Sequence, residues 1–197
     1  MAERGVSGAL VGIDVGGTKV AAAVVNGLDI VERVEQPTEL TSTQALLDQI
    51  AAVARDALTR AGAGELRAAG AGIPSQIDAA SGTALASVNI PLSGVPVREE
   101  LGNRLGVPVF VDNDANCAAL AEARLVPDPP ADELVMLTLG TGVGGGIVVD
   151  GRIFRGATGL GAELGHIVVD GRERTPAAPG AFPRPGSLEW HCSGRPL

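Results

Sequence analysis

The fold is decided by the stretch Val107-Pro108-Val109-Phe110-Val111-Asp112-Asn113-Asp114-Ala115-Asn116. Its first five residues form an apolar run, interrupted only by Pro108, that is typical of a buried strand. Alanine-rich residues 117–123 follow and favour a helix. Polar side chains therefore gather where a strand ends and a helix begins, which is the edge at which open α/β sheets bind ligands. The stretch predicts an α/β fold with a site at this edge.

Asp114 and Asn113 are the candidate functional residues of this stretch. A carboxylate at such an edge can act as a general base on a sugar hydroxyl, and the amide of Asn113 can help to hold the sugar. The alternative is that Asp114 only caps the helix, because aspartate often occupies the N-cap position. These residues by themselves leave both interpretations open.

The composition limits the class of protein. A chain of 197 residues forms one or two domains. Hydrophobic residues make up 45% of the chain and aromatic residues only 2%, so the core must be built from alanine, valine, leucine and isoleucine. The net charge of -8 disfavours nucleic-acid binding, and no apolar run approaches the roughly 20 residues of a membrane span. Two cysteines, Cys117 and Cys192, fit a reducing compartment, so we expect a cytoplasmic protein.

A glycine-rich turn lies between two predicted strands near the N-terminus. Residues 9–14 and 20–25 are apolar, and the turn between them contains Gly16-Gly17-Thr18-Lys19. Backbone N–H groups of a Gly-Gly turn can approach an anion closely, and the last two residues of the turn add a hydroxyl group and a cation. Asp14, at the end of the first strand, could hold Mg²⁺ through water. The spacing is not that of a Walker A loop, and a plain β-hairpin turn is the alternative interpretation.

The remaining elements are predicted from periodicity and turn residues. Helices are predicted over 41–61 and 97–105, and strands over 30–34, 66–73, 134–139 and 147–149. Residues 76–95 are interpreted as a loop. Asn89 in this loop is a candidate ligand-binding residue, and local hydrogen bonding to the backbone is the alternative.

A proline-rich segment marks the expected domain boundary. Residues 126–132 include two adjacent prolines and have the composition of a loop. We therefore expect an N-terminal α/β lobe over 1–126, which contains the candidate base, and a partial second α/β lobe over 127–197.

An internal repeat links the two expected lobes. When the chain is shifted by 124 positions without a gap, Gly16 falls on Gly140 and Gly27 on Gly151. Each copy is a strand, a glycine-rich turn, a strand and a small-residue turn, and the second glycine-rich turn covers 140–146. Two such turns that face one another could grip one polyphosphate from both sides. The repeat therefore favours a nucleotide as ligand.

A third candidate group follows the second turn. Glu163 and His166 are three residues apart and would share one face of a helical turn. A carboxylate and an imidazole can bind adjacent sugar hydroxyls, and the imidazole can alternatively bind a metal. A purely structural histidine remains the other interpretation.

Taken together, these motifs resemble the ROK family of sugar kinases and related repressors, especially its bacterial glucokinases. The resemblance covers nearly the whole chain and rests on four segments in the same order: residues 13–19, 113–116, 140–146 and 161–166. It implies the actin-like ATPase fold, which is ribonuclease H-like, with two α/β lobes and ATP in the cleft. The first lobe would be complete in this chain and the second lobe partial.

The resemblance implies roles for the residues at matching positions. Asp114 would be the catalytic base. The sugar ligands would be Asn89, Asn113, Asp114, Glu163, His166 and Glu189. The phosphate loops would be formed by Gly16, Gly17, Thr18, Lys19, Gly140, Thr141, Gly142, Val143 and Gly144, with Asp14 holding Mg²⁺ through water.

Two departures from the family pattern affect these expectations. The family usually has three clustered cysteines that complete a zinc site with the histidine, and residues 171–186 contain none of them. One histidine and the distant Cys192 do not make a tetrahedral site, so we expect zinc to be absent or weakly bound, with His166 a ligand only if a site survives. Local reading-frame damage over 171–186 is a hypothesis that the nucleotide sequence would decide. The chain also stops at Leu197, short of the usual family length, which is interpreted as truncation.

The expected function is ATP-dependent phosphorylation of a hexose, with glucose as the first choice. N-acetylmannosamine and fructose are the alternative sugars, and an inactive fragment or a sugar-responsive regulator is the alternative class. Direct binding to DNA is not expected, because only eight residues precede the first strand. The expected ligands are a hexose, ATP and Mg²⁺, and a homodimer is a possible assembly because the family often dimerises.

Overall fold

The computed structural model describes residues 8–125, 129–173 and 183–194. The chain divides into two compact units, Met1–Asp114 and Ala115–Leu197. This division falls directly after the candidate base. The boundary expected at 126/127 lies outside the described residues.

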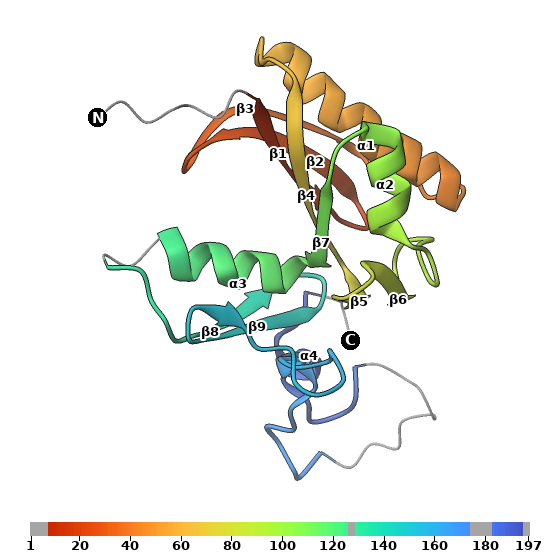
Figure 1. Cartoon of the computed structure of the whole chain (residues 1–197). Coiled ribbons are helices and arrows are strands. Elements are labelled where there is room, and N and C mark those ends of the chain that lie inside the picture. Colours follow the sequence, from red (N-terminus) through yellow and green to blue (C-terminus); the bar gives the residue numbers. More distant parts are fainter. Residues whose placement is uncertain (1–7, 126–128, 174–182, 195–197) are drawn as a thin grey trace. The chain divides into compact units, whose positions relative to one another are not determined.

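The first unit is built on a five-stranded sheet in the order β3-β2-β1-β4-β7 (Figure 1). Its strands are β1 (Ala9–Val15), β2 (Lys19–Asn26), β3 (Asp29–Pro37), β4 (Leu66–Ile73) and β7 (Val109–Asn113). The first three strands pair antiparallel, while β1, β4 and β7 run parallel. The carboxyl ends of the three parallel strands therefore meet at one edge of the sheet. Each predicted strand of this unit is confirmed, although β7 begins after Pro108 and continues to Asn113.

Two helices, α1 (Thr43–Arg60) and α2 (Val97–Leu105), pack on this sheet as predicted (Figure 1). α1 begins after Ser42, whose hydroxyl oxygen accepts a hydrogen bond from the Ala45 N–H at 3.1 Å. Its apolar residues at helical spacing are buried in the core: Leu46, Ile50, Val53 and Ala57. α2 ends at Leu105 and is followed by Gly106, which adopts a φ of 73° that favours glycine. No helix among the described residues is both long and apolar enough to cross a membrane.

The prediction that residues 76–95 form a loop is wrong for the first half of this range. The structure places a two-stranded hairpin there, formed by β5 (Ser75–Asp78) and β6 (Thr83–Ser87). The Asp78 carboxylate accepts a hydrogen bond from the Ser81 hydroxyl at 2.6 Å, which lowers the pKa of Asp78, and Gly82 turns with a φ of 75°. The hairpin therefore depends on turn chemistry and not on an apolar run, which is why apolar periodicity did not predict it.

The described part of the second unit contains helix α3, the glycine-rich hairpin and two shorter helices. Its elements are α3 (Asp114–Leu125), β8 (Leu134–Leu139), β9 (Val143–Val149), β10 (Arg152–Ile153), the 3₁₀ helix η1 (Leu164–His166) and α4 (Leu188–Cys192). Asp114, the first residue of α3, is assigned to the first unit and the rest of the helix to the second. The strand order is β10-β9-β8, with antiparallel pairing throughout.

The repeat predicted from the sequence is present in the topology of both units. The order β10-β9-β8 in the second unit matches β3-β2-β1 in the first, and all four pairings are antiparallel. The two turns differ in length, because Val15 pairs with Val20 whereas Leu139 pairs with Val143. The ungapped shift therefore superimposes the first strand of each hairpin and misplaces the second strand by one residue.

Three glycines expected in the second turn lie in strand β9 instead. The turn itself covers only Gly140–Gly142, since β9 begins at Val143. A Cβ atom on Gly146 would collide with the Ala119 side chain and lie 2.8 Å from the Ala115 carbonyl oxygen. Glycine is therefore needed here because helix α3 packs directly on the strand, and not because the backbone turns.

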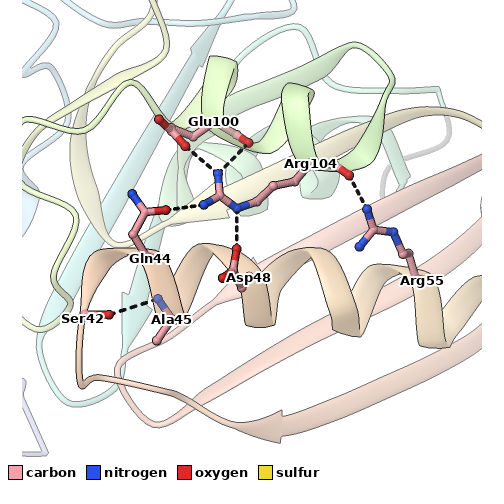
Figure 2. A network of polar contacts seen from close by, with 7 residues as sticks. All are labelled: Ser42, Gln44, Ala45, Asp48, Arg55, Glu100 and Arg104. Atoms are coloured by element: carbon pink, nitrogen blue, oxygen red, sulfur yellow. Dashed lines mark hydrogen bonds and ion pairs between the residues drawn. The ribbon is translucent and has the colours of Figure 1, made fainter.

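A polar network joins the two helices of the first unit (Figure 2). The Arg104 guanidinium on α2 donates to the carboxylates of Asp48 on α1, at 2.8 Å, and Glu100 on its own helix. It also donates to the Gln44 side chain, while Arg55 donates to the Arg104 carbonyl oxygen. The Arg104 side chain is only 19% exposed, and the bond to Asp48 is the main cause that raises its pKa. This geometry predicts that Arg104 fixes α2 against α1.

We expect Arg104→Ala to lower the free energy of unfolding by about 1–2 kcal/mol, because several charge-assisted bonds are lost together. Urea unfolding followed by circular dichroism measures this loss. Arg60→Ala is the matched control, since Arg60 is 58% exposed and, among the described residues, pairs with one carboxylate only, that of Asp56 on its own helix. Equal losses in the two variants would show that the network contributes no more than an ordinary surface ion pair.

Candidate functional site

Asn113 and Asp114 lie at the carboxyl edge of the parallel strands, as predicted. Asn113 ends β7 and Asp114 is the first residue of α3. The Asn113 N–H donates to the Asp112 carboxylate at 2.8 Å, and the Asn113 side-chain amide donates to the Ser75 carbonyl oxygen at 3.3 Å. Both residues are half-buried. The bond to Ser75 therefore fixes the direction of the Asn113 side chain beside the candidate base.

Asp14 lies on the same edge, in register with two other carboxylates. Asp14 pairs with Gly72 of β4, which pairs with Asp112 of β7. On its other side Asp14 pairs with Ala21, which pairs with Glu35. Residues paired across strands point to the same face of a sheet, so small residues separate the carboxylates by two strand spacings, roughly 10 Å. The exposed Asp14 carboxylate is therefore open to hydrated ligands.

The first glycine turn is held by bonds that the sequence did not predict. The Gly16 N–H donates to the Lys19 carbonyl oxygen at 2.8 Å, which closes the turn. The Thr38 hydroxyl donates to the Gly16 carbonyl oxygen at 2.6 Å, and the Thr38 N–H donates to the Thr18 carbonyl oxygen at 2.9 Å. A Cβ atom on Gly17 would lie 3.3 Å from the Asn89 Cβ, so Asn89 lies against this turn. The turn is thus a fixed feature, and Asn89 is its neighbour.

The Lys19 ammonium group pairs with Glu35 of β3 at 3.0 Å. Both side chains are about half exposed, and Arg33 also contacts the carboxylate at 3.0 Å. The hydrogen bond and charge of Lys19 are the main causes that lower the pKa of Glu35. The pair therefore favours the folded state at neutral pH, and that contribution is lost as the pH falls through the Glu35 pKa.

The second glycine turn contacts a residue that is far away in the sequence. The Val143 N–H, directly after the turn, donates to the Glu189 carboxylate at 3.1 Å. Glu189 was predicted as a sugar ligand. The structure shows that its carboxylate also contacts Val143, one of the residues predicted to form the phosphate loop. Val143 and Gly144, also assigned to the loop, lie at the start of β9.

Glu163 and His166 lie together at the ends of the 3₁₀ helix η1. The Glu163 carboxylate and His166 Nε2 are 3.7 Å apart, and their side chains are 52% and 40% exposed. A Cβ atom on Gly165 between them would collide with the Val143 carbonyl oxygen, so η1 packs tightly on β9. The two side chains therefore lie on one face, as predicted, and both are partly exposed.

The donor set for zinc is incomplete in the part of the chain that the structure describes. No group of three or more histidine, cysteine, aspartate and glutamate side chains gathers there in a way that could hold a metal ion. Cys117 and Cys192 are both exposed and are not joined in a disulfide. Within the segment 171–186, where the resemblance led us to look for the family's cysteines, residues 174–182 lie outside the described residues. The described residues therefore do not fit a tetrahedral zinc site.

Each unit gathers its own share of the predicted residues. The first unit holds Asp14, residues 16–19, Asn89, Asn113 and Asp114, and the second holds residues 140–144, Glu163, His166 and Glu189. The sequence analysis missed Thr38, Glu35 and Ser75, which support the candidates through the bonds above. Thr38 directly follows β3, and Glu35 lies in it, but the strand pairing that turns Glu35 toward Lys19 is irregular, and nothing local signals Ser75.

Comparison with known proteins gives one consistent result. The ROK family model matches residues 10–197. Glucokinase of Streptomyces coelicolor is 36% identical over 81% of this chain and 50% of its own length, and N-acetyl-D-glucosamine kinase of Vibrio atlanticus is 42% identical over 79% and 51%. A ROK family glucokinase from Streptomyces griseus, solved with glucose and AMPPNP, matches with a TM-score of 0.78 and 33% identity over 95% of this chain and 58% of that one. The chain therefore spans about half the length of the curated relatives it matches, and the expected actin-like ATPase class of α/β fold is confirmed.

Proposed function

Because the chain belongs to the ROK family, we propose that it transfers the γ-phosphate of ATP to a hydroxyl group of a hexose, with glucose as the preferred substrate. The observation that carries this proposal is the position of Asn113 and Asp114 at the carboxyl edge of the parallel strands. The similar Streptomyces griseus glucokinase was solved with glucose and an ATP analogue, which supports the choice of both substrates. The need for ATP supports a cytoplasmic location for the protein.

In the proposed reaction, Asp114 accepts the proton of the primary hydroxyl group of the hexose. The freed oxygen attacks the γ-phosphorus in line, and ADP leaves. Asn113, Glu163 and His166 bind the remaining hydroxyl groups, since amide, carboxylate and imidazole groups can all hydrogen-bond to them. The ordered Asn113 side chain and the exposed pair at η1 support these roles.

The glycine turns are proposed to bind the phosphates. Backbone N–H groups of Gly17 and Thr18 in the first turn, and of Thr141 and Gly142 in the second, would donate to phosphoryl oxygens. Mg²⁺, when bound, neutralises charge on the phosphates. Asp14 fits this ion because its exposed carboxylate can accept hydrogen bonds from the water shell that Mg²⁺ keeps.

N-acetyl-D-glucosamine is a second candidate substrate. The observation that favours it is the relative from Vibrio atlanticus, which is named as a kinase for that sugar and is 42% identical. A panel of glucose, N-acetyl-D-glucosamine, N-acetylmannosamine and fructose with ATP, followed by coupled release of ADP, separates the candidates. We expect glucose to give the highest kcat/KM. Release of ADP that no sugar accelerates would contradict the proposal.

Lys19 offers a separate test of the first turn. In the nucleotide-free chain the Glu35 carboxyl group should titrate below its usual pKa, and Lys19→Ala should raise that pKa. If the Lys19 ammonium group moves to a phosphate, MgATP should also raise the Glu35 pKa in the wild-type chain, because Glu35 then loses the hydrogen bond and the charge of Lys19. NMR titration of the Glu35 carboxyl carbon measures both shifts. A Glu35 pKa that does not respond to bound MgATP would exclude Lys19 as a phosphate ligand.

A further inference from the structure

The segment that carries α4 forms a hydrogen bond at each end of the second glycine turn. At the start of the turn, the Gly194 N–H donates to the Gly140 carbonyl oxygen at 2.7 Å. At its end, the Val143 N–H donates to Glu189 Oε2 at 3.1 Å. A turn of three residues is therefore bracketed by two hydrogen bonds to one segment about fifty positions later in the chain.

The approach between this segment and the turn is close. A Cβ atom on Gly142 would lie 3.1 Å from Glu189 Oε2, and a Cβ atom on Gly194 would lie 3.1 Å from the Gly140 carbonyl oxygen. Both separations are tighter than ordinary contacts of a Cβ atom. Glycine at these positions thus lets the Glu189 carboxylate reach the backbone of the turn.

The α4 segment is itself anchored to the segment that follows η1. The Leu188 N–H donates to the Ile167 carbonyl oxygen at 2.9 Å, and the Val169 N–H donates to the Gly186 carbonyl oxygen at 2.8 Å. Ser187 is fully buried, and its hydroxyl oxygen accepts a hydrogen bond from the Trp190 N–H at 3.2 Å. Glu189 is therefore held by a rigid support that also carries the Glu163–His166 pair.

We infer that Glu189 is a positioning residue for the second glycine turn, in addition to its proposed contact with the sugar. Its carboxylate fixes the Val143 N–H, and through it the turn whose N–H groups would meet the phosphates. A glycine-rich turn is otherwise mobile, so holding it in advance removes an entropic cost from nucleotide binding. A carboxylate has two oxygen atoms, so one can hold the turn while the other accepts a sugar hydroxyl. The effect on nucleotide binding rests on the proposed kinase function. The contact between Glu189 and the Val143 N–H does not depend on that function.

Amide hydrogen exchange at Val143 tests the contact directly. We expect Glu189→Ala to accelerate exchange at least about tenfold, as for the loss of a bond to a charged acceptor. Glu189→Gln should keep most of the protection, because its amide oxygen still accepts, whereas Glu189→Asp should lose it because the shorter side chain withdraws the acceptor. Glu163→Ala is the matched control and should leave the Val143 amide unchanged. Unchanged exchange in both Glu189→Ala and Glu189→Asp would overturn the inference.

Nucleotide affinity measured without sugar tests the consequence. We expect Glu189→Ala to raise the Kd for MgATP several-fold and Glu189→Gln to leave it near the wild-type value. A residue that only bound sugar would raise the KM for sugar in both variants and leave the Kd for MgATP unchanged, which would contradict the positioning role. If the wild-type chain bound no MgATP, the proposed function would fail, while the exchange experiment would still decide whether Glu189 holds the turn.

Discussion

Asp114→Asn should reduce the turnover of ATP and hexose by about 10²–10⁴-fold, the usual contribution of a general base. The amide that replaces the carboxylate cannot accept the proton of the hydroxyl group. Its size is unchanged, so the sugar should still bind within a few-fold of the wild-type affinity. Steady-state kinetics, together with calorimetric titration of the sugar, separate these two effects.

The control for this variant is Glu122→Gln, which makes the same chemical change at an exposed position of the same helix. Its turnover should match that of the wild-type chain. If Asp114 served only to begin α3, Asp114→Asn would retain turnover, because asparagine is favoured at helix starts nearly as strongly as aspartate. Retained turnover would therefore remove the base assignment and support the capping role.

Gly146→Ala should lower the free energy of unfolding of the second unit by about 2 kcal/mol. The added methyl group would collide with Ala119 of α3 and crowd the Ala115 carbonyl oxygen. Among the described residues, the fully buried part of the cluster there is Ala119, Ala123 and Val148, with Leu134, Met136 and Ile153 partly buried against it, so this small core can absorb little of the overlap. Helix α3 must move away from β9, and the unit loses much of its core contact.

The single tryptophan of the chain, Trp190, lies in α4 and reports on this unit by fluorescence. Urea unfolding followed at Trp190 should show a lower midpoint for Gly146→Ala. Gly171→Ala is the matched control in the same unit, because a Cβ atom there would meet nothing within 4 Å. Equal midpoints for the two variants would show that α3 does not pack on β9 as described.

The edge of the first sheet was predictable because local signals agree there. An apolar run, a polar cluster and an alanine-rich segment follow one another around Asn113, and each corresponds to an observed strand end or helix start. The repeat predicted two similar hairpins, and the structure confirms both. In contrast, the β5–β6 hairpin depends on the hydrogen bonds of Asp78 in its turn, which an apolar pattern does not reveal.

The partner of Lys19 was unpredictable because of one irregularity in the strand pairing. A regular hairpin from Asn26↔Asp29 would place Glu35 on the opposite face of the sheet from Lys19. The pairing shifts by one residue between Val24 and Val25, so that Ala21 pairs with Glu35 and the carboxylate turns to the face of Lys19. A single bulge thus determines that Lys19, the candidate phosphate ligand, pairs with the Glu35 carboxylate.

The contact between Val143 and Glu189 was unpredictable for a different reason. The two residues are 46 positions apart, and no periodic pattern relates them. Resemblance to the family suggested Glu189 as a sugar ligand, and only the folded structure shows that its carboxylate also reaches the backbone beyond the second turn. Contacts of this kind arise from tertiary packing and leave no local trace in the sequence.

The most direct measurement follows the γ-phosphate itself. ATP labelled at the γ-phosphate is incubated with Mg²⁺, glucose and the 197-residue chain, and the products are separated. The proposed reaction predicts that the label moves to a sugar phosphate, and that Asp114→Asn prevents this transfer. Label that stays in ATP, or that passes to inorganic phosphate whether or not glucose is present, would contradict it.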